Sequence, residues 1–290
     1  MSVSDCASLA GNATKITARG FGWTHAGRSE PALSDIDVVI EPGERVLLCG
    51  DSGSGKSTFL AAMAGVLGSD EEGTRTGELF LEDSSGLVEE PGHTIPVGLV
   101  LQDPDSQVIS ARVGDDIAFG CENLAYPREE IWRRVAAAKE LVGPFVDLDF
   151  PTERLSGGQK QRLALAGVIA MGAGVVLLDE PTANLDPAGA RDVVRAVSRL
   201  VEETGATLVV VEHQHAAWDG VLDRAVELDR GRIVADTSFA EVAQRRQVSG
   251  LPQARRLSEA ELAQRDAALW STDLVTRYGP PRTIALPAGA

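Results

Sequence analysis

The apolar positions of this chain fall into short continuous runs that alternate with longer amphipathic stretches. Continuous runs of aliphatic residues are typical of strands that are buried on both faces. The predicted strands are residues 15–18, 35–40, 45–49, 78–81, 97–101, 175–178 and 207–211, then a hairpin-like pair at 224–228 and 232–235. The predicted helices are residues 56–67, 128–142, 157–171 and 187–205. This alternation predicts an α/β fold whose mostly parallel core sheet is covered by helices on both faces.

The stretch from about residue 103 to 154 interrupts the alternation. It is rich in proline and contains one clearly amphipathic helix, so it is predicted to be a helical insertion in the α/β core. The chain is therefore expected to comprise a polar leader (1–14), a main domain (15–248) and a tail (249–290).

The composition limits the classes of partner. The 290 residues carry a formal net charge of −16, with an isoelectric point near 4.7. Nucleic-acid binding and direct adhesion to an anionic membrane both require a basic surface, so neither is expected. No run reaches the roughly 20 apolar residues of a spanning helix. Any membrane contact is therefore expected to pass through a protein partner.

A glycine-rich loop lies between the predicted strand 45–49 and the helix that follows it. Its sequence fits the phosphate-binding pattern GxxxxGK[ST] and consists of Gly50, Asp51, Ser52, Gly53, Ser54, Gly55, Lys56, Ser57 and Thr58. Glycines let the backbone amides wrap phosphate groups at a helix N-terminus. We expect Lys56 to bridge the β- and γ-phosphates and the Ser57 hydroxyl to bind magnesium, which predicts ATP and Mg²⁺ as ligands.

A second motif places two carboxylates at the end of the apolar strand 175–178. We expect Asp179 to hold the magnesium ion, through water, and Glu180 to polarise the attacking water and take its proton. This pair together with the phosphate loop predicts an ATPase, but many classes of phosphate-loop ATPase share both features.

The sequence Leu155-Ser156-Gly157-Gly158-Gln159 narrows the class, because it resembles the LSGGQ signature of the ATP-binding cassette (ABC) family. A helix that begins with Ser156, Gly157 and Gly158 can present amides to an anion, although Ser-x-x-Gln is also an ordinary helix cap, and the two uses are compatible. The resemblance spans about residues 15–248. It implies the ABC nucleotide-binding form of the phosphate-loop fold, with an N-terminal antiparallel β region, and two subunits that close over ATP.

The same resemblance implies roles for single residues elsewhere. Gln102, at the end of a predicted strand, matches the glutamine that reaches magnesium and water, and Asp186 matches an aspartate that contacts the other subunit. His213 matches the histidine that contacts the γ-phosphate. Trp23 occupies the place of an aromatic residue that stacks on adenine, with burial in the core as the alternative.

The run that follows Gln102 resembles a particular branch, the energy-coupling factor importers and the related cobalt and nickel importers. This branch implies an ATPase on the cytoplasmic face of the membrane, attached peripherally. Its implied partners are a second ABC ATPase subunit, identical or related, an integral membrane coupling subunit and a substrate-capture protein for a vitamin or transition-metal ion. Cys121 departs from the pattern, since proline is expected there. The alternatives are another class of ABC importer, a soluble ABC ATPase that acts on nucleic acid or the ribosome, and a regulatory partner that does not hydrolyse ATP.

The tail matches no family pattern. Residues 258–271 are predicted as a possible short helix, although Asp266 interrupts its apolar stripe. Such a segment could extend the dimer contact, dock on the main domain or be weakly ordered.

Overall fold

The computed structural model describes residues 13–67, 73–143, 146–213 and 215–243, and the backbone of 267–271 and 284–287. The chain divides into two compact units, Met1–Gln244 and Arg245–Ala290. Among the described residues, no helix has both the length and the apolar character needed to cross a membrane.

A six-stranded sheet forms the centre of the first unit, with strand order β10-β9-β3-β8-β7-β6. Its strands are β3 (Arg45–Cys49), β6 (Val97–Val100), β7 (Val175–Asp179), β8 (Thr207–Val211), β9 (Arg224–Asp229) and β10 (Arg232–Ser238). All neighbouring pairs are parallel except β9 and β10, which pair antiparallel. The mostly parallel core predicted from the apolar runs is therefore confirmed.

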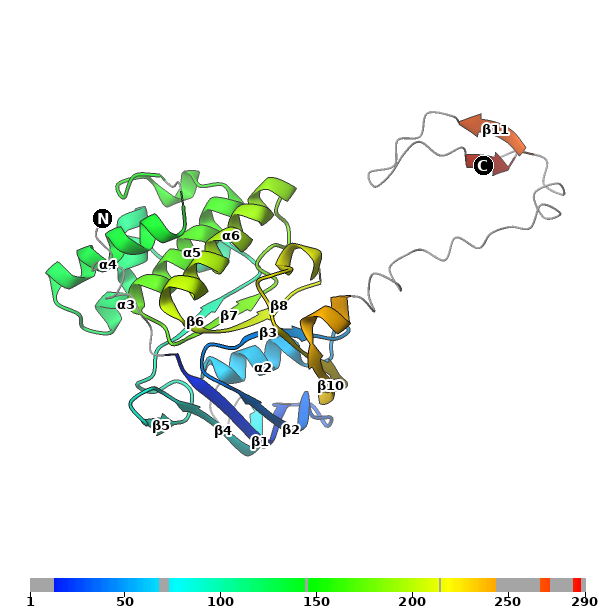
Figure 1. Ribbon diagram of the computed structural model, residues 1–290, viewed down its shortest axis with the longest axis horizontal. Helices are drawn as coiled ribbons and strands as arrows, with labels where there is room; N and C mark the ends of the chain where they lie inside the picture. The colour runs from blue at the N-terminus through cyan, green and yellow to red at the C-terminus, as the bar shows by residue number, and fades with distance from the viewer. Residues whose placement is uncertain are drawn as a thin grey trace. The chain divides into compact units, whose positions relative to one another are not determined.

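Helices cover both faces of this sheet. They are α2 (Lys56–Met63), α3 (Val113–Asn123), α4 (Arg128–Leu141), α5 (Gly157–Met171) and α6 (Pro187–Thr204). Figure 1 shows α5 and α6 on one face and α2 on the other, between the central sheet and a second sheet.

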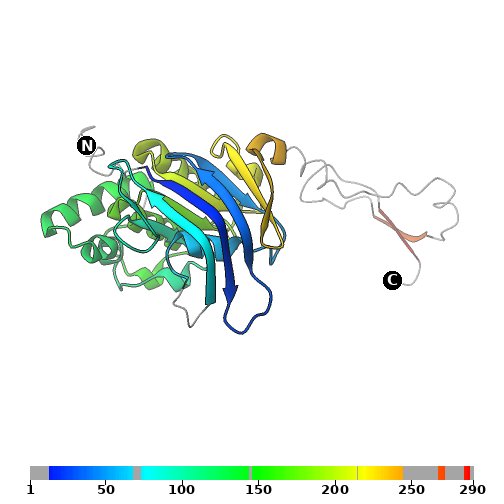
Figure 2. The same cartoon turned by 90° about the horizontal axis from the view of Figure 1, so that it is seen from below.

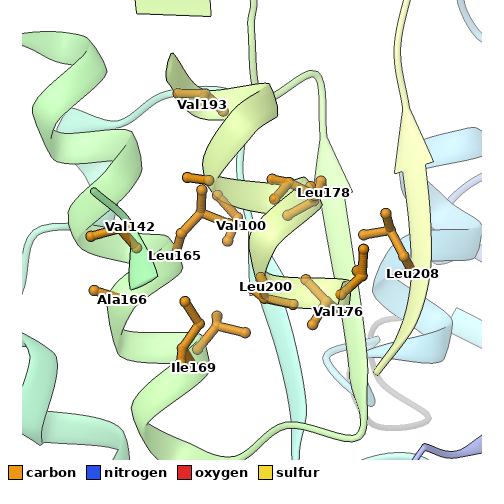
Figure 3. Close-up of a cluster of buried hydrophobic side chains, with 14 of the residues drawn as sticks. Val100, Val142, Leu165, Ala166, Ile169, Val176, Leu178, Val193, Leu200 and Leu208 are labelled. Carbon is orange, nitrogen blue, oxygen red and sulfur yellow. The ribbon is translucent and has the colours of Figure 1, made fainter. Parts of the chain in front are cut away.

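Side chains on the two faces of the central strands pack in two separate hydrophobic cores. Val176 and Leu178 of β7 pack in one core with α5 and α6, while Val175 and Leu177 pack in the other with α2. This division follows from the two-residue period of a strand, whose successive side chains point to opposite faces. Figure 3 shows part of the first core, where Leu165 and Leu200 lie among the strand residues.

The second sheet is the N-terminal antiparallel region, with order β2-β1-β4-β5. Its strands are β1 (Lys15–His25), β2 (Leu33–Ile40), β4 (Gly73–Glu82) and β5 (Val88–Glu89). Figure 2 shows the long blue and cyan strands β1, β2 and β4 side by side. The antiparallel region is confirmed, but β1 and β4 are longer than predicted.

Glycines explain this underestimate. A Cβ on Gly77 would lie 2.1 Å from the carbonyl oxygen of Gly20, so the two strands approach through their backbones at a bulge. The register between β1 and β4 shifts between Arg19 and Gly22. A glycine-rich stretch that reads as a turn in the sequence is thus a bulge within continuous strands.

Two helices also differ from their predictions. Helix α2 ends at Met63 instead of residue 67, because the amides of Gly65 and Val66 turn back to the carbonyls of Ala62 and Ala61. Helix α3 was not predicted at all. Its glycines lower helix propensity, but Gly120 lets it approach α5, since a Cβ there would lie 3.2 Å from Met171.

In the second unit, the described backbone forms two antiparallel strands, β11 (Ala267–Ser271) and β12 (Ile284–Pro287). The possible helix over 258–271 is wrong for its last five residues, whose backbone pairs with another strand instead. The remainder of that prediction, residues 258–266, lies outside the described residues.

The contact between β6 and α5 gives a prediction about stability. A Cβ on Gly98 would lie 2.2 Å from Val168 Cγ1, so Gly98→Ala must push α5 away from the sheet. We expect a loss of about 1–3 kcal/mol in the free energy of unfolding, measured by urea denaturation. Gly167→Ala on α5 is the control. Its Cβ meets no atom within 4 Å, and alanine should stabilise the helix by up to about 1 kcal/mol. Equal effects of both changes would contradict this account.

Candidate nucleotide site

The glycine-rich loop joins β3 to α2 at the carboxyl edge of the central sheet. Two of its glycines are required by close backbone contacts. A Cβ would lie 2.1 Å from the Leu228 carbonyl oxygen at Gly50 and 2.6 Å from the Ala32 carbonyl oxygen at Gly55, and both residues have positive φ. The loop tip, consisting of Asp51, Ser52 and Gly53, is exposed. The loop therefore has a fixed base and an open mouth.

Lys56 fills the inside of this loop. Its side chain is only 7% exposed, and Nζ donates to the carbonyl oxygens of Gly50 at 3.0 Å and Asp51 at 2.8 Å. An ammonium group held among backbone dipoles can exchange those carbonyls for phosphate oxygens. The donor set of lysine and loop amides therefore fits a phosphate chain.

Asp179 lies beside this loop at the end of β7 and shares a hydrogen bond with the Ser57 hydroxyl. Burial raises the pKa of Asp179, and the charge of Glu180 raises it further. The Ser57 bond and the electrostatic interactions with Lys56 and His213 act in the opposite direction. A hydroxyl and a carboxylate are oxygen ligands of the kind that Mg²⁺ prefers. The residues present therefore fit a magnesium ion bound with a phosphate.

Glu180 and His213 are brought into contact from the ends of β7 and β8. His213 Nε2 lies 3.1 Å from Glu180 Oε1. The Glu180 backbone has a φ of 48°, and its N–H donates to the Val211 carbonyl at 2.9 Å. This left-handed turn bends the chain directly after the strand. The structure thus gathers Lys56, Ser57, Asp179, Glu180 and His213 at one edge.

The Ser156 segment forms the N-terminus of α5 as a reciprocal cap. The Gln159 N–H donates to Ser156 Oγ at 3.3 Å, and the Ser156 N–H donates to Gln159 Oε1 at 2.8 Å. Ser156 and Gly157 are exposed. The motif therefore forms the helix cap expected of a Ser-x-x-Gln sequence, and the N-terminus of α5 faces solvent.

The predicted residues Asp186 and Gln102 occupy loops next to this edge. Asp186 is exposed and caps α6, where its Oδ1 accepts from the Gly189 N–H at 2.7 Å. Gln102 is exposed just after β6. Two further residues, Gln107 and Gln161, were not predicted for the site. Their side-chain amides bond the Leu101 backbone and hold the loop of Gln102. No spacing rule identifies such loop supports.

The structure does not support adenine stacking by Trp23 and favours the alternative of core packing. Trp23 is 5% exposed and belongs to the buried core cluster, and a Cβ on Gly73 would lie 2.4 Å from its Cζ2. Its Nε1 donates to His25 Nδ1 at 3.2 Å, and His25 Nε2 lies 3.3 Å from Thr58 Oγ1. The exposed ring beside the loop is therefore His25. The alternation of a strand, which places residues 23 and 25 on one face, is the signal that could have found it.

Comparison with known proteins gives a consistent result. A family model described as ABC transporter matches residues 33–183. The chain is 39% identical over 216 residues to the energy-coupling factor transporter ATP-binding protein EcfA1 of Caldanaerobacter subterraneus, covering 74% of this chain and 76% of that protein. It is 37% identical over 227 residues to a putative ABC transporter ATP-binding protein of Methanosarcina acetivorans, covering 77% of this chain. The chain spans only 35% of that relative and 39% of one from Methanosarcina mazei.

Two solved structures have the same fold. The structure of cbiO1 from Clostridium perfringens, described as part of the ABC transporter complex cbiONQ, has a TM-score of 0.68 at 30% identity, covering 80% of this chain and 92% of that one. The ATP-binding cassette MJ0796, bound to ADP and Pi, has a TM-score of 0.63 at 22% identity and covers 77% of this chain and 98% of that one. The second similarity concerns the fold alone.

The buried carboxylate of Asp179 predicts a pH effect on stability without nucleotide. Because its folded pKa lies above the ordinary 3.8, the ionised form destabilises the fold, and this penalty is relieved as the pH falls through the folded pKa. We expect Asp179→Asn to raise the thermal midpoint of unfolding at neutral pH, with a smaller gain near the ordinary pKa. Asp219→Asn, an exposed site, is the control and should leave the midpoint unchanged. A gain for Asp179→Asn that grows as the pH falls would contradict the proposed burial penalty.

Proposed function

This chain belongs to the ABC transporter family of ATP-binding proteins, and from that premise we propose that it binds MgATP at the loop of residues 50–58 and hydrolyses it to energise a membrane importer. One observation carries the proposal. Five side chains with complementary chemistry lie together at one edge of the central sheet. Asp179 interacts there with Lys56, Ser57, Glu180 and His213, and Glu180 contacts His213.

The loop residues would hold the triphosphate. In this role Lys56 releases the Gly50 and Asp51 carbonyls and pairs with the β- and γ-phosphates, while the loop amides bind phosphate oxygens. Ser57 and Asp179 would hold Mg²⁺, which when bound offsets phosphate charge. Gln102, which is exposed just after β6, would approach the same magnesium ion and water.

Glu180 and His213 would carry the proton and charge changes of hydrolysis. The Glu180 carboxylate orients a water molecule and accepts its proton, and the His213 ring stabilises charge at the γ-phosphate. Their present contact of 3.1 Å holds both side chains at the mouth of the site. Binding of ATP would exchange this contact for contacts with water and phosphate.

A second ABC subunit, identical or related, would complete each site. The α5 N-terminus, with Ser156, Gly157 and Gly158, is a positive helix end that faces solvent. Gly158 and Gly189 are close, since a Cβ on Gly158 would lie 3.6 Å from Gly189 Cα, which places the Asp186 cap beside the signature. These two elements are available together for the nucleotide held by another chain.

An apolar groove supports the proposed attachment to a membrane coupling subunit. A cavity of about 470 Å³ lies between β6, the edge strand of the central sheet, and helices α3 and α5. Four of its lining residues are large exposed hydrophobics, Leu101, Ile109, Phe119 and Leu124. Clustered exposed apolar side chains are typical of a protein interface. A coupling segment that contacts Leu101 would lie one residue from Gln102 and so could sense the nucleotide.

The named relatives favour the energy-coupling factor type of importer. EcfA1 carries that name, and cbiO1 is described as part of a transporter complex. For this chain we therefore propose a vitamin or transition-metal ion as cargo, a membrane substrate-capture protein as a further partner, and a peripheral position on the cytoplasmic face of the membrane. The net charge of −16 disfavours the alternative of a nucleic-acid or ribosome ATPase.

Removal of the proposed base tests catalysis. Glu180→Gln should retain ATP binding and reduce turnover by at least about 100-fold, because the amide cannot accept a proton. It should also accumulate a nucleotide-bound dimer. Phosphate release and size-exclusion chromatography with MgATP measure these effects. Glu140→Gln, an exposed change on α4, is the matched control. Turnover near that of the unmodified protein in Glu180→Gln would remove Glu180 from its proposed role.

A charge in the groove tests the membrane partner. Ile109→Glu should lower recovery of a multi-span membrane protein from native membranes by about tenfold or more, which corresponds to roughly 1.4 kcal/mol. ATP binding should be retained. Val234→Glu is the control, since Val234 on β10 is 58% exposed and Ile109 is 60% exposed. Equal recovery with both variants, identified by mass spectrometry, would exclude the groove as the docking surface.

A further inference from the structure

Glu212 is a buried carboxylate directly before His213. It follows β8 and is only 4% exposed. A carboxylate withdrawn from water is destabilising unless hydrogen bonds compensate it. The hydrogen-bond partners of Glu212 therefore explain how a carboxylate can be buried directly before His213.

Both carboxylate oxygens of Glu212 accept hydrogen bonds from functional loops. Oε1 accepts from the backbone N–H of His213 at 2.7 Å. Oε2 accepts from the hydroxyl of Thr182, which is itself 4% exposed. Thr182 lies two residues after Glu180 in a turn closed by the Ala183 N–H and the Glu180 carbonyl at 3.0 Å. A single side chain thus ties the loop of the proposed base to the loop of the proposed phosphate sensor.

The backbone before and after Glu212 is held by further contacts. His215 Nε2 lies 3.0 Å from the Glu212 carbonyl oxygen, and the buried His215 ring meets Phe239 edge-on at 6.5 Å. The Glu180 N–H bonds the Val211 carbonyl at 2.9 Å. With the chain fixed on both sides, the carboxylate has little freedom to leave its two donors.

We propose that Glu212 is a positioning residue that sets the placement of His213 relative to Glu180, and that Thr182 is its partner. This inference rests on the proposed ATPase function. Glu212 contacts neither water nor phosphate in this role. It holds the His213 amide and the turn after Glu180, so that the imidazole and carboxylate arrive together at the γ-phosphate. Positioning of this kind affects the chemical step much more than it affects binding of the nucleotide.

The bonds between the two loops can be tested as a pair. In Glu212→Gln the amide nitrogen cannot accept, so one donor loses its acceptor, and in Thr182→Val the hydroxyl is removed at nearly constant size. Each change should lower kcat by about tenfold with a KM for ATP unchanged within about twofold. The double variant should be no slower than the slower single variant, because both remove the same link. Glu203→Gln, exposed on α6, should behave as the unmodified protein.

Hydrogen exchange gives a readout that does not depend on turnover. The His213 amide should be protected in the unmodified protein and should exchange at least about tenfold faster in Glu212→Ala, while the amides of β8 keep their protection. Unchanged exchange at His213 would overturn the positioning role even if ATP hydrolysis were absent. Two further results would overturn it as well. One is a kcat in both single variants equal to that of the unmodified protein, and the other is a loss of ATP affinity and of thermal stability as large as the loss in kcat. Absence of hydrolysis in the unmodified protein would instead refute the proposed function.

Discussion

The parallel register of β3, β8 and β7 is the constraint on which the rest of this structure depends. Leu48 and Asp179 both lie opposite Val211, so the three strands end at the same level of the sheet. The residues that follow, the glycine-rich loop, Glu180 and Glu212, therefore emerge side by side although they are far apart in sequence. A shift of one residue in this register would turn every strand side chain to the opposite core and would separate these loops.

This edge concentrates charge where water is partly excluded, and the charges compensate one another locally. Lys56 is held by loop carbonyls, Glu212 by Thr182 and His213, and Glu180 by the His213 ring. Burial still raises the pKa of Asp179, although the Ser57 hydroxyl, Lys56 and His213 act against that shift. A partly buried carboxylate beside a buried ammonium offers one ligand for a cation and one for an anion, which suits a metal–phosphate ligand.

Local sequence patterns were sufficient for the central strands and the glycine-rich loop, because each of these is determined by neighbours in the chain. Local patterns were not sufficient where a contact between residues distant in sequence determines the secondary structure. The bulge between Gly20 and Gly77 joins residues that are distant in sequence, and α3 is stabilised by α5 in spite of its glycines. Trp23 and Glu212 show the same limit for the site. Nothing in the sequence around either residue shows that the indole is covered by Gly73 or that the carboxylate has Thr182 as its donor.

The proposed catalytic cycle would use the bonds that hold the site in this single chain. Lys56 bonds its own loop, His213 bonds Glu180, and the Ser156 amide bonds the Gln159 side chain, so the proposed ligand-binding groups are occupied by internal partners. Binding of MgATP and of a second subunit would exchange these bonds for others, instead of filling vacant donors. Such an exchange would make the net free energy of closing the two subunits small compared with the individual bonds that are broken and formed. In the proposed cycle, the loss of one phosphate on hydrolysis would then shift this balance and reopen the pair.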